Sequence, residues 1–120
     1  MILVDTSVWI DHLRRNNTRL ALLLEAGQVR SHPFVVGELA CGTLRQRTVV
    51  LALLGKLPAS TVPTPEETLA FIDARRLMGQ GLGYVDMHLL ASAVLDGTRL
   101  WSLDKRLDQA ARTLGVAAQQ

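Results

Sequence analysis

This chain of 120 residues has a single cysteine, few aromatic residues and no long apolar run. Cys41 has no partner for an internal disulfide bond, which excludes a disulfide-rich scaffold and favours a reducing compartment. Its apolar neighbours predict a small buried side chain, and the lack of a Cys/His cluster argues against zinc. The apolar segments are too short to span a bilayer, and Asp5 and Asp11 interrupt the N-terminal segment where a signal peptide would be apolar. We therefore expect a cytoplasmic protein that does not enter a membrane.

The composition predicts one domain with an aliphatic core. A chain of this length supports a single core, and here 48% of the residues are hydrophobic but only 4% are aromatic. The formal charge is +2, and the cations are eleven arginines and two lysines. Arginine suits bidentate contacts with phosphate, so a nucleic-acid partner is one interpretation of this surface. An ordinary solvated basic surface explains the charge equally well.

Apolar strand-like segments alternate with helical segments along the chain. This alternation predicts a three-layer α/β/α domain over residues 1–120, with a short parallel sheet of four to five strands. Prolines in first turns and glycines after last turns set the helix boundaries. The expected strands are residues 2–4, 28–32, 60–62, 99–102 and 115–117, and the expected helices are 8–15, 18–26, 33–44, 45–56, 65–78, 85–95 and 104–114.

Four of the eleven acidic residues lie where a solvated helix face does not explain them. Asp5 and Asp104 each follow an apolar strand, at the sheet edge where α/β folds bind ligands. Glu38 lies in an otherwise uncharged helix, and Asp86 opens an apolar helix after a glycine-rich loop. Each residue also has a structural interpretation: helix capping or an Asx turn for the three aspartates, and plain surface exposure for Glu38.

One shared site explains all four carboxylates together. Clustered carboxylates repel one another, and Mg²⁺ or Mn²⁺ with oxygen ligands relieves that repulsion. Such a site is suited to phosphodiester cleavage, because a bound metal activates water and stabilises the leaving oxygen. We expect Asp5 and Asp86 to bind the metal directly. Glu38 and Asp104 then complete the pocket, directly or through waters, and one of them assists deprotonation of the attacking water.

Four segments of the chain resemble, in order, the motifs of PIN-domain ribonucleases, particularly the VapC-type toxins of bacterial toxin–antitoxin pairs. The segments are ILVDTSVWID (2–11), PFVVGEL (33–39), GLGYVDMHLLASA (81–93) and LWSLDKRL (100–107). The resemblance covers essentially the whole chain. It implies a Mg²⁺-dependent endoribonuclease, acting as a toxin, whose metal-binding and catalytic set is the four carboxylates above.

The same resemblance assigns roles to hydroxyl groups near the first and last acids. It implies that Thr6 or Ser7 orients the first carboxylate, and that Ser102 orients the last one. Some family members carry a further acid shortly after the last one. Asp108 has that spacing here, but we expect it to form an ion pair with Arg112 instead.

Basic and apolar surfaces suggest partners. The candidate RNA-binding residues are Arg14, Arg15, Arg45, Lys105 and Arg106, although solvated helix faces explain them equally well. The helices at 18–26 and 45–56 carry more apolar surface than one core face needs. This surface suggests a homodimer seam, an antitoxin groove, or both, and the resemblance implies both a homodimer and a VapB-like antitoxin.

Two other functions compete with RNA cleavage. A non-catalytic PIN-like module would bind RNA or protein, but it has no reason to keep four repelling acids. A phosphorylated aspartate after the first strand would need a nearby lysine, for which Lys105 is the candidate. The three histidines, His12, His32 and His88, are scattered, so no catalytic histidine is expected.

Overall fold

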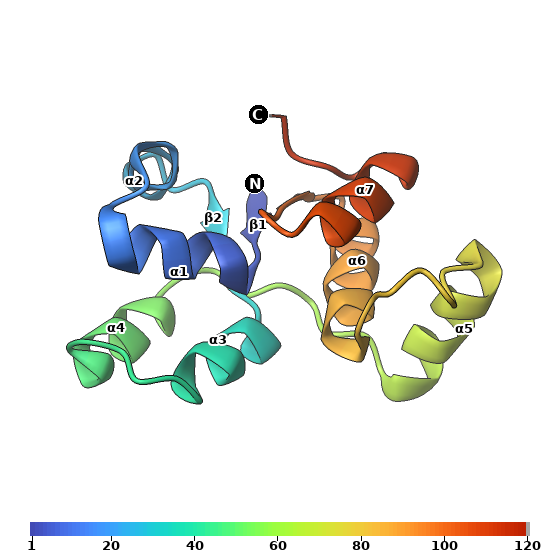
Figure 1. Ribbon diagram of the computed structural model, residues 1–120, viewed down its shortest axis with the longest axis horizontal. Helices are drawn as coiled ribbons and strands as arrows, with labels where there is room; N and C mark the ends of the chain where they lie inside the picture. Colours follow the sequence, from blue (N-terminus) through green and yellow to red (C-terminus); the bar gives the residue numbers. More distant parts are fainter. Residues whose placement is uncertain (120) are drawn as a thin grey trace.

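The centre of the fold is a parallel sheet of three short strands in the order β2-β1-β3 (Figure 1). The computed structural model describes residues 1–119. β1 (Ile2–Val4) pairs with β2 (Val29–Arg30) on one side and with β3 (Arg99–Trp101) on the other. Leu3 and Val4 are fully buried, because a central strand is covered on both faces. The apolar run at the start of the chain therefore forms the middle of the sheet.

Helices cover both faces of this sheet. Figure 1 shows the first four helices on one side and the last three on the other, which is the predicted three-layer arrangement. They are α1 (Thr6–Arg15), α2 (Thr18–Glu25), α3 (Pro33–Ala40), α4 (Arg47–Leu54), α5 (Pro65–Arg75), α6 (Tyr84–Asp96) and α7 (Lys105–Thr113). Residues 87–93 of α6 are all buried, so this helix is the core element of its layer. Within residues 1–119, no helix has both the length and the apolar character needed to cross a membrane.

The predicted number of strands is too high. Residues 60–62 and 115–117 do not form strands, and only two isolated parallel bridges, Ser31–Ala59 and Leu100–Ala117, occur near them. Pro58 and Pro63 flank the first segment, and proline has no N–H to donate to a ladder. The second segment begins at Gly115, which has a left-handed backbone with φ of 75°. The described chain therefore has three strands rather than four or five.

Three helices are shorter than predicted by more than one residue at an end: α4 covers Arg47–Leu54 instead of 45–56, and α3 and α5 end early. α3 ends at Ala40 instead of residue 44, and Cys41 after it is exposed rather than buried, contrary to expectation. α5 ends at Arg75 because Arg76 adopts a left-handed backbone with φ of 54°. The early ends of α3 and α5 have one cause. Apolar residues that follow each helix, such as Leu44 and Leu77, lie in loops and still pack in or against the hydrophobic core. Hydrophobic periodicity alone cannot distinguish such residues from a continued helix.

Candidate active site

The four predicted carboxylates lie at one edge of the sheet, where the strands end. β1 and β3 are parallel neighbours, so Asp5 and Asp104, which follow them, leave the sheet on the same side. Asp86 lies in the first turn of α6, and Glu38 lies in α3. Burial raises the pKa of Asp86 above its usual value, and the charges of Asp5, Asp104 and Glu38 raise it further. Asp86 is therefore close enough to the other three carboxylates to be affected by their charges.

Asp5 is buried, and two hydroxyl groups hold its side chain. The residue is 6% exposed, and its Oδ2 accepts hydrogen bonds from Ser7 Oγ at 2.6 Å and from Ser102 Oγ at 2.7 Å. The backbone of Asp5 occupies the N-cap position of α1, but its side chain makes no capping bond. The capping interpretation is therefore wrong for Asp5, and the predicted contact with Ser7 is present.

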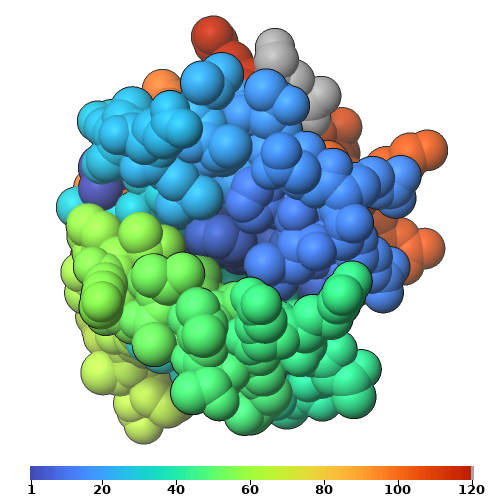
Figure 2. Space-filling view, turned by 90° about the vertical axis from the view of Figure 1, so that its left-hand side faces the viewer, coloured from blue at the N-terminus to red at the C-terminus, as the bar shows by residue number. Residues whose placement is uncertain are grey.

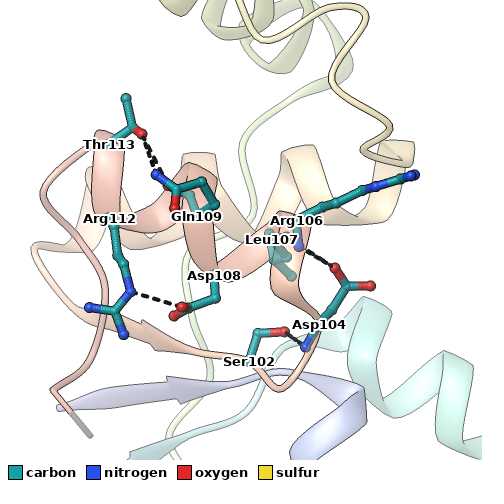
Figure 3. A network of polar contacts seen from close by, with 8 residues as sticks. All are labelled: Ser102, Asp104, Arg106, Leu107, Asp108, Gln109, Arg112 and Thr113. Carbon is teal, nitrogen blue, oxygen red and sulfur yellow. Dashed lines mark hydrogen bonds and ion pairs between the residues drawn. The ribbon is translucent and has the colours of Figure 1, made fainter.

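The same two hydroxyl groups tie Asp5 to the turn that carries Asp104. Ser102 Oγ accepts a hydrogen bond from the Asp104 amide at 3.0 Å (Figure 3), and Ser7 Oγ accepts one from the Leu103 amide at 3.0 Å. Because an amide can only donate, each hydroxyl group is left to donate its single proton to Asp5. Ser102 thus orients Asp104 through the backbone, as expected in outline, and orients Asp5 with its own proton.

Asp86 and Asp104 combine a capping bond with a place in the site. Asp104 Oδ1 accepts hydrogen bonds from the amides of Arg106 at 2.9 Å and Leu107 at 3.1 Å, which caps α7. Asp86 Oδ2 accepts a hydrogen bond from the Gly83 amide at 2.9 Å at the start of α6. The capping interpretation is therefore right for both residues. It accounts for only one oxygen of each carboxylate.

Glu38 is exposed and has a hydroxyl partner of its own. Its Oε1 accepts a hydrogen bond from Thr6 Oγ1 at 2.6 Å. The expectation that Thr6 orients Asp5 is therefore wrong. α1 packs against α3, so the first side chain of α1 reaches across to α3 instead of back to the strand end.

Within the described chain, no cationic side chain forms an ion pair with these four carboxylates. Within residues 1–119, each uses only one oxygen in hydrogen bonds with the protein. The ion pairs of this part of the chain all lie elsewhere: Asp11–Arg15, Arg30–Asp96 and Asp108–Arg112, the last being the predicted pair. Unpaired carboxylate oxygens are the donors that Mg²⁺ and Mn²⁺ prefer, so the donor set fits such an ion.

The spacing of these donors is wider than a closed metal site. In the described chain, no three Asp, Glu, His or Cys side chains surround a common point closely enough to hold an ion. Asp5 is fixed by its hydroxyl partners, whereas Glu38 and Asp104 are exposed. The two exposed side chains are therefore less restrained than that of Asp5.

Comparison with known proteins settles the family. The model of the PIN domain matches residues 2–113. The chain belongs to the PIN-domain family. It is 52% identical over 118 residues to Ribonuclease VapC32 of Mycobacterium tuberculosis, a match that covers 98% of this chain and 95% of that protein. The predicted resemblance to VapC-type PIN domains is confirmed.

Solved structures agree on the fold of this PIN domain. FitAcB from Neisseria gonorrhoeae has a TM-score of 0.69 at 22% identity, over 100% of this chain and 97% of that one. The structure of FitAB bound to an IR36 DNA fragment has a TM-score of 0.65 at 19% identity, over 98% and 92%. At these identities the likeness shows the fold alone, and it confirms the predicted α/β class.

The predicted RNA-binding residues of the PIN domain lie in three places. Arg14 and Arg45 line a groove of about 550 Å³ between α1 and the loop after α3. Arg15 forms an ion pair with Asp11 at 3.0 Å. Lys105 and Arg106 are exposed at the start of α7, beside Asp104, and Figure 3 shows the Arg106 and Asp104 side chains extending to the same side of that helix.

Arg106 rests on the glycine-rich loop that leads to α6. A Cβ atom at Gly81 would lie 2.5 Å from Arg106 Nη1, so only glycine leaves room for the guanidinium. Gly81 also has a left-handed backbone with φ of 76°, which favours glycine. This contact connects the segment before Asp86 with the segment after Asp104. No sequence motif identified it, because it depends on how α7 meets the loop.

Two buried histidines are structural. His32 Nδ1 accepts a hydrogen bond from the Phe34 amide at 3.1 Å, which leaves Nε2 to donate to Ser92 Oγ at 3.0 Å. Burial, and after it the neighbouring His88, lower the pKa of His32 to about 4, while Asp96 opposes the shift. Burial also lowers the pKa of His88. Both rings are therefore neutral at physiological pH.

Proposed function

We propose that this PIN domain is a Mg²⁺-dependent endoribonuclease that acts as the toxin of a VapBC-type toxin–antitoxin pair. The relationship to Ribonuclease VapC32 supports the nuclease activity and the toxin class. The metal dependence is supported by the four carboxylates at one edge of the sheet, which form no ion pair within residues 1–119. Burial and the charges of the other three raise the pKa of Asp86.

In this proposal, two carboxylates would bind the metal ion directly and two would complete the site. Asp5 and Asp86 are the direct ligands of Mg²⁺, or of Mn²⁺ in its place, and Glu38 and Asp104 complete the pocket directly or through waters. When bound, the ion supplies Lewis-acid stabilisation of the phosphate and a more acidic water. Glu38 or Asp104, the two exposed carboxylates, accepts the proton of the attacking water. Their exposure leaves them room to adjust to a bound RNA.

The hydroxyl groups keep the buried ligand in place. Ser7 and Ser102 both donate to the same oxygen of Asp5, which leaves Oδ1 for the metal. Thr6 likewise donates a hydrogen bond to Oε1 of Glu38, which leaves Oε2 for the metal. A metal ligand that is oriented by such hydrogen bonds binds its ion more tightly than a mobile one.

The RNA strand would follow the basic residues around the acidic site. Arg14, Arg45, Lys105 and Arg106 are exposed and form no ion pair within residues 1–119. Arg15 stays a candidate, because its exposed ion pair with Asp11 contributes little and is easily exchanged for a phosphate contact. Contacts of this kind would make RNA binding fall with added salt.

An apolar groove beside α4 would receive the protein partner. The groove has a volume of about 410 Å³, and Figure 2 shows the hollow between α1 in blue and α4 in green. Leu22, Val49 and Leu53 on α2 and α4 are more than half exposed, at 61%, 54% and 57%. We propose that this surface binds a VapB-like antitoxin, a second copy of the chain, or both, in the cytoplasm.

The test is RNA cleavage by purified variants in millimolar Mg²⁺. Asp5→Asn removes one negative charge from the site and should lower the cleavage rate at least about 100-fold, since a metal supplies several kcal/mol of stabilisation. Asp11→Asn is the matched control on α1, because Asp11 is paired with Arg15 outside the site, and it should cleave normally. A chelator should abolish cleavage by the wild-type protein. Equal cleavage by Asp5→Asn and wild type would overturn the site.

The spacing of the carboxylates favours one alternative, a PIN domain that binds RNA or protein without cutting it. Thermal melting discriminates the two functions. A metal-dependent nuclease should melt at a higher temperature in millimolar Mg²⁺ or Mn²⁺, because the ion binds only the folded protein. An unchanged melting temperature together with absent cleavage would favour the binding module.

A further inference from the structure

Tyr84 is the one aromatic side chain with a largely exposed ring in the described part of the chain. The sequence contains five aromatic residues. Trp9 and Trp101 are each 4% exposed, and Phe34 and Phe71 are partly buried. Tyr84 is 47% exposed. A chain with so few aromatic residues leaves one ring at its surface, and no sequence pattern distinguishes this ring from the others.

The exposed ring of Tyr84 is held in place by a row of aromatic contacts. Its ring meets the ring of His88 edge to face, with centroids 4.7 Å apart and an interplanar angle of 87°. His88 in turn meets Phe34 at 4.5 Å, and Phe34 meets His32 at 5.4 Å. Both histidines are buried. The ring is therefore supported by the core on one side and open to solvent elsewhere, so little conformational entropy is lost when a ligand packs on it.

Tyr84 borders the acidic site. It is the first residue of α6 and lies between Gly83 and Asp86, which are joined by the hydrogen bond that caps this helix. The aromatic row runs from α6 to Phe34 on α3, and Glu38 lies one turn beyond Phe34 on the same face of α3. The ring thus lies at the start of α6, two residues before Asp86, and packs on His88, which contacts α3 through Phe34.

We infer that the ring of Tyr84 stacks on an unpaired base of the RNA substrate. This inference rests on the proposed nuclease function and adds a binding residue to it. A base is the uncharged part of a nucleotide, so an uncharged ring can bind it on a rim that is crowded with carboxylates. Stacking on an aromatic ring suits any base whose face is free, and a duplex does not offer one.

The decisive experiment is a double-mutant cycle between the ring and a base. A single-stranded RNA oligonucleotide that the wild-type protein cleaves is compared with versions that carry one abasic nucleotide beside the cut. Tyr84→Ala should lower kcat/KM about tenfold on the intact RNA, as should the abasic nucleotide at one flanking position. If ring and base contact each other, the two changes together should cost little more than either alone.

Further variants separate stacking from packing. Tyr84→Phe keeps the ring and should cleave like wild type, whereas Tyr84→Leu keeps apolar contact with His88 and should lose activity like Tyr84→Ala. Leu95→Ala is the matched control, since Leu95 is 54% exposed in the last turn of the same helix. Melting temperatures of all variants show whether they fold. Multiplicative losses in the cycle, or full activity of a folded Tyr84→Leu protein, would overturn the stacking role.

The outcome also distinguishes failure of this inference from failure of the proposed function. A wild-type protein that cleaves no RNA overturns the proposed function. Binding of labelled single-stranded RNA by the Asp5→Asn protein then tests stacking alone, and Tyr84→Ala in that background should weaken binding about tenfold. If Tyr84→Ala leaves RNA binding intact but weakens a copurifying antitoxin, the ring contacts protein and the inference is wrong.

Discussion

The ends of β1 and β3 are alike in sequence but use their aspartates differently. In both places an apolar strand leads to an aspartate with an extended backbone, and a helix follows. Asp104 caps its helix with two hydrogen bonds and stays exposed. Asp5 stands at the corresponding position, is 6% exposed, and makes no capping bond at all. Its carboxylate is turned toward Ser7 and Ser102 instead.

This difference sets the carboxylate of Asp5 apart from that of Asp104. A side-chain cap contributes about 1 kcal/mol of stability, so α1 forgoes that contribution by using Asp5 elsewhere. Burying a carboxylate that caps no helix and pairs with no cation within residues 1–119 carries a cost, which the two hydroxyl hydrogen bonds offset only in part. Asp104, by contrast, serves its helix with one oxygen and keeps the other available. Asp5 after β1 makes no helix cap, whereas Asp104 after β3 caps α7 and still has one free oxygen.

Asp86 provides the sharpest test of this distinction, because it caps like Asp104 but has the raised pKa. Asp86→Asn keeps an oxygen that accepts from the Gly83 amide and removes the charge. Mg²⁺ should stabilise the wild-type protein by about 2.7 kcal/mol at one hundred times its Kd, and this gain should largely disappear in the variant. Thermal melting with and without the ion measures both. An equal Mg²⁺ effect in the two proteins would contradict the role of Asp86.

The same variant gives a pH dependence with a definite sign. Burial and the neighbouring carboxylates raise the pKa of Asp86 in the folded protein. Between the usual pKa of an aspartate and the raised one, the folded protein binds more protons than the unfolded chain, so stability falls as the pH rises. Without metal, Asp86→Asn should therefore melt above the wild type at pH 7. The difference should shrink as the pH falls from the raised pKa toward the usual one, and it should be absent below the usual pKa.

Ser102 connects the two strand ends, and its removal should come next in size. Ser102→Ala removes a donor to Asp5 and the acceptor of the Asp104 amide. Loss of a hydrogen bond that orients a metal ligand typically lowers metal affinity or activity 10- to 100-fold. The measurement is the Mg²⁺ concentration for half-maximal RNA cleavage, which should rise by about that factor. Ser60→Ala is the matched control, because Ser60 is also buried and its hydroxyl has no partner within residues 1–119.

The two strand ends also show which features of the site can be predicted from the sequence. Asp5, Asp86 and Asp104 are predictable as neighbours because each follows a strand or opens a helix, and parallel strands end at the same edge. The order of strands and helices follows from the same local signals. The paired residues within a short sheet do not, since pairing joins segments far apart in the chain. Residues 60–62 and 115–117 therefore resemble strands in sequence, but the structure has only isolated bridges there, at Ala59 and Ala117.

The hydrogen-bond partners of the carboxylates cannot be predicted from the sequence, because they too depend on how distant segments pack. Thr6 and Ser7 are adjacent and chemically similar, yet Thr6 bonds Glu38 and Ser7 bonds Asp5. Successive residues of a helix point about 100° apart, so the packing of α1 decides which hydroxyl faces which acid. The distance between the carboxylates is likewise a property of packing. The sequence predicts that they meet, and the structure adds that two of them are exposed.

The smallest expected effect separates the cap of Asp104 from its charge. Asp104→Ala removes both, and should lower the free energy of unfolding by about 1 kcal/mol through the lost cap of α7. Asp104→Asn keeps a good capping residue, so it should lower RNA cleavage while leaving stability unchanged. Asp5→Asn has no cap to lose and should likewise keep its stability. Urea unfolding measures all three. If Asp5→Asn lost as much stability as Asp104→Ala, the two strand ends would be structurally equivalent, and the special role of Asp5 would have no support.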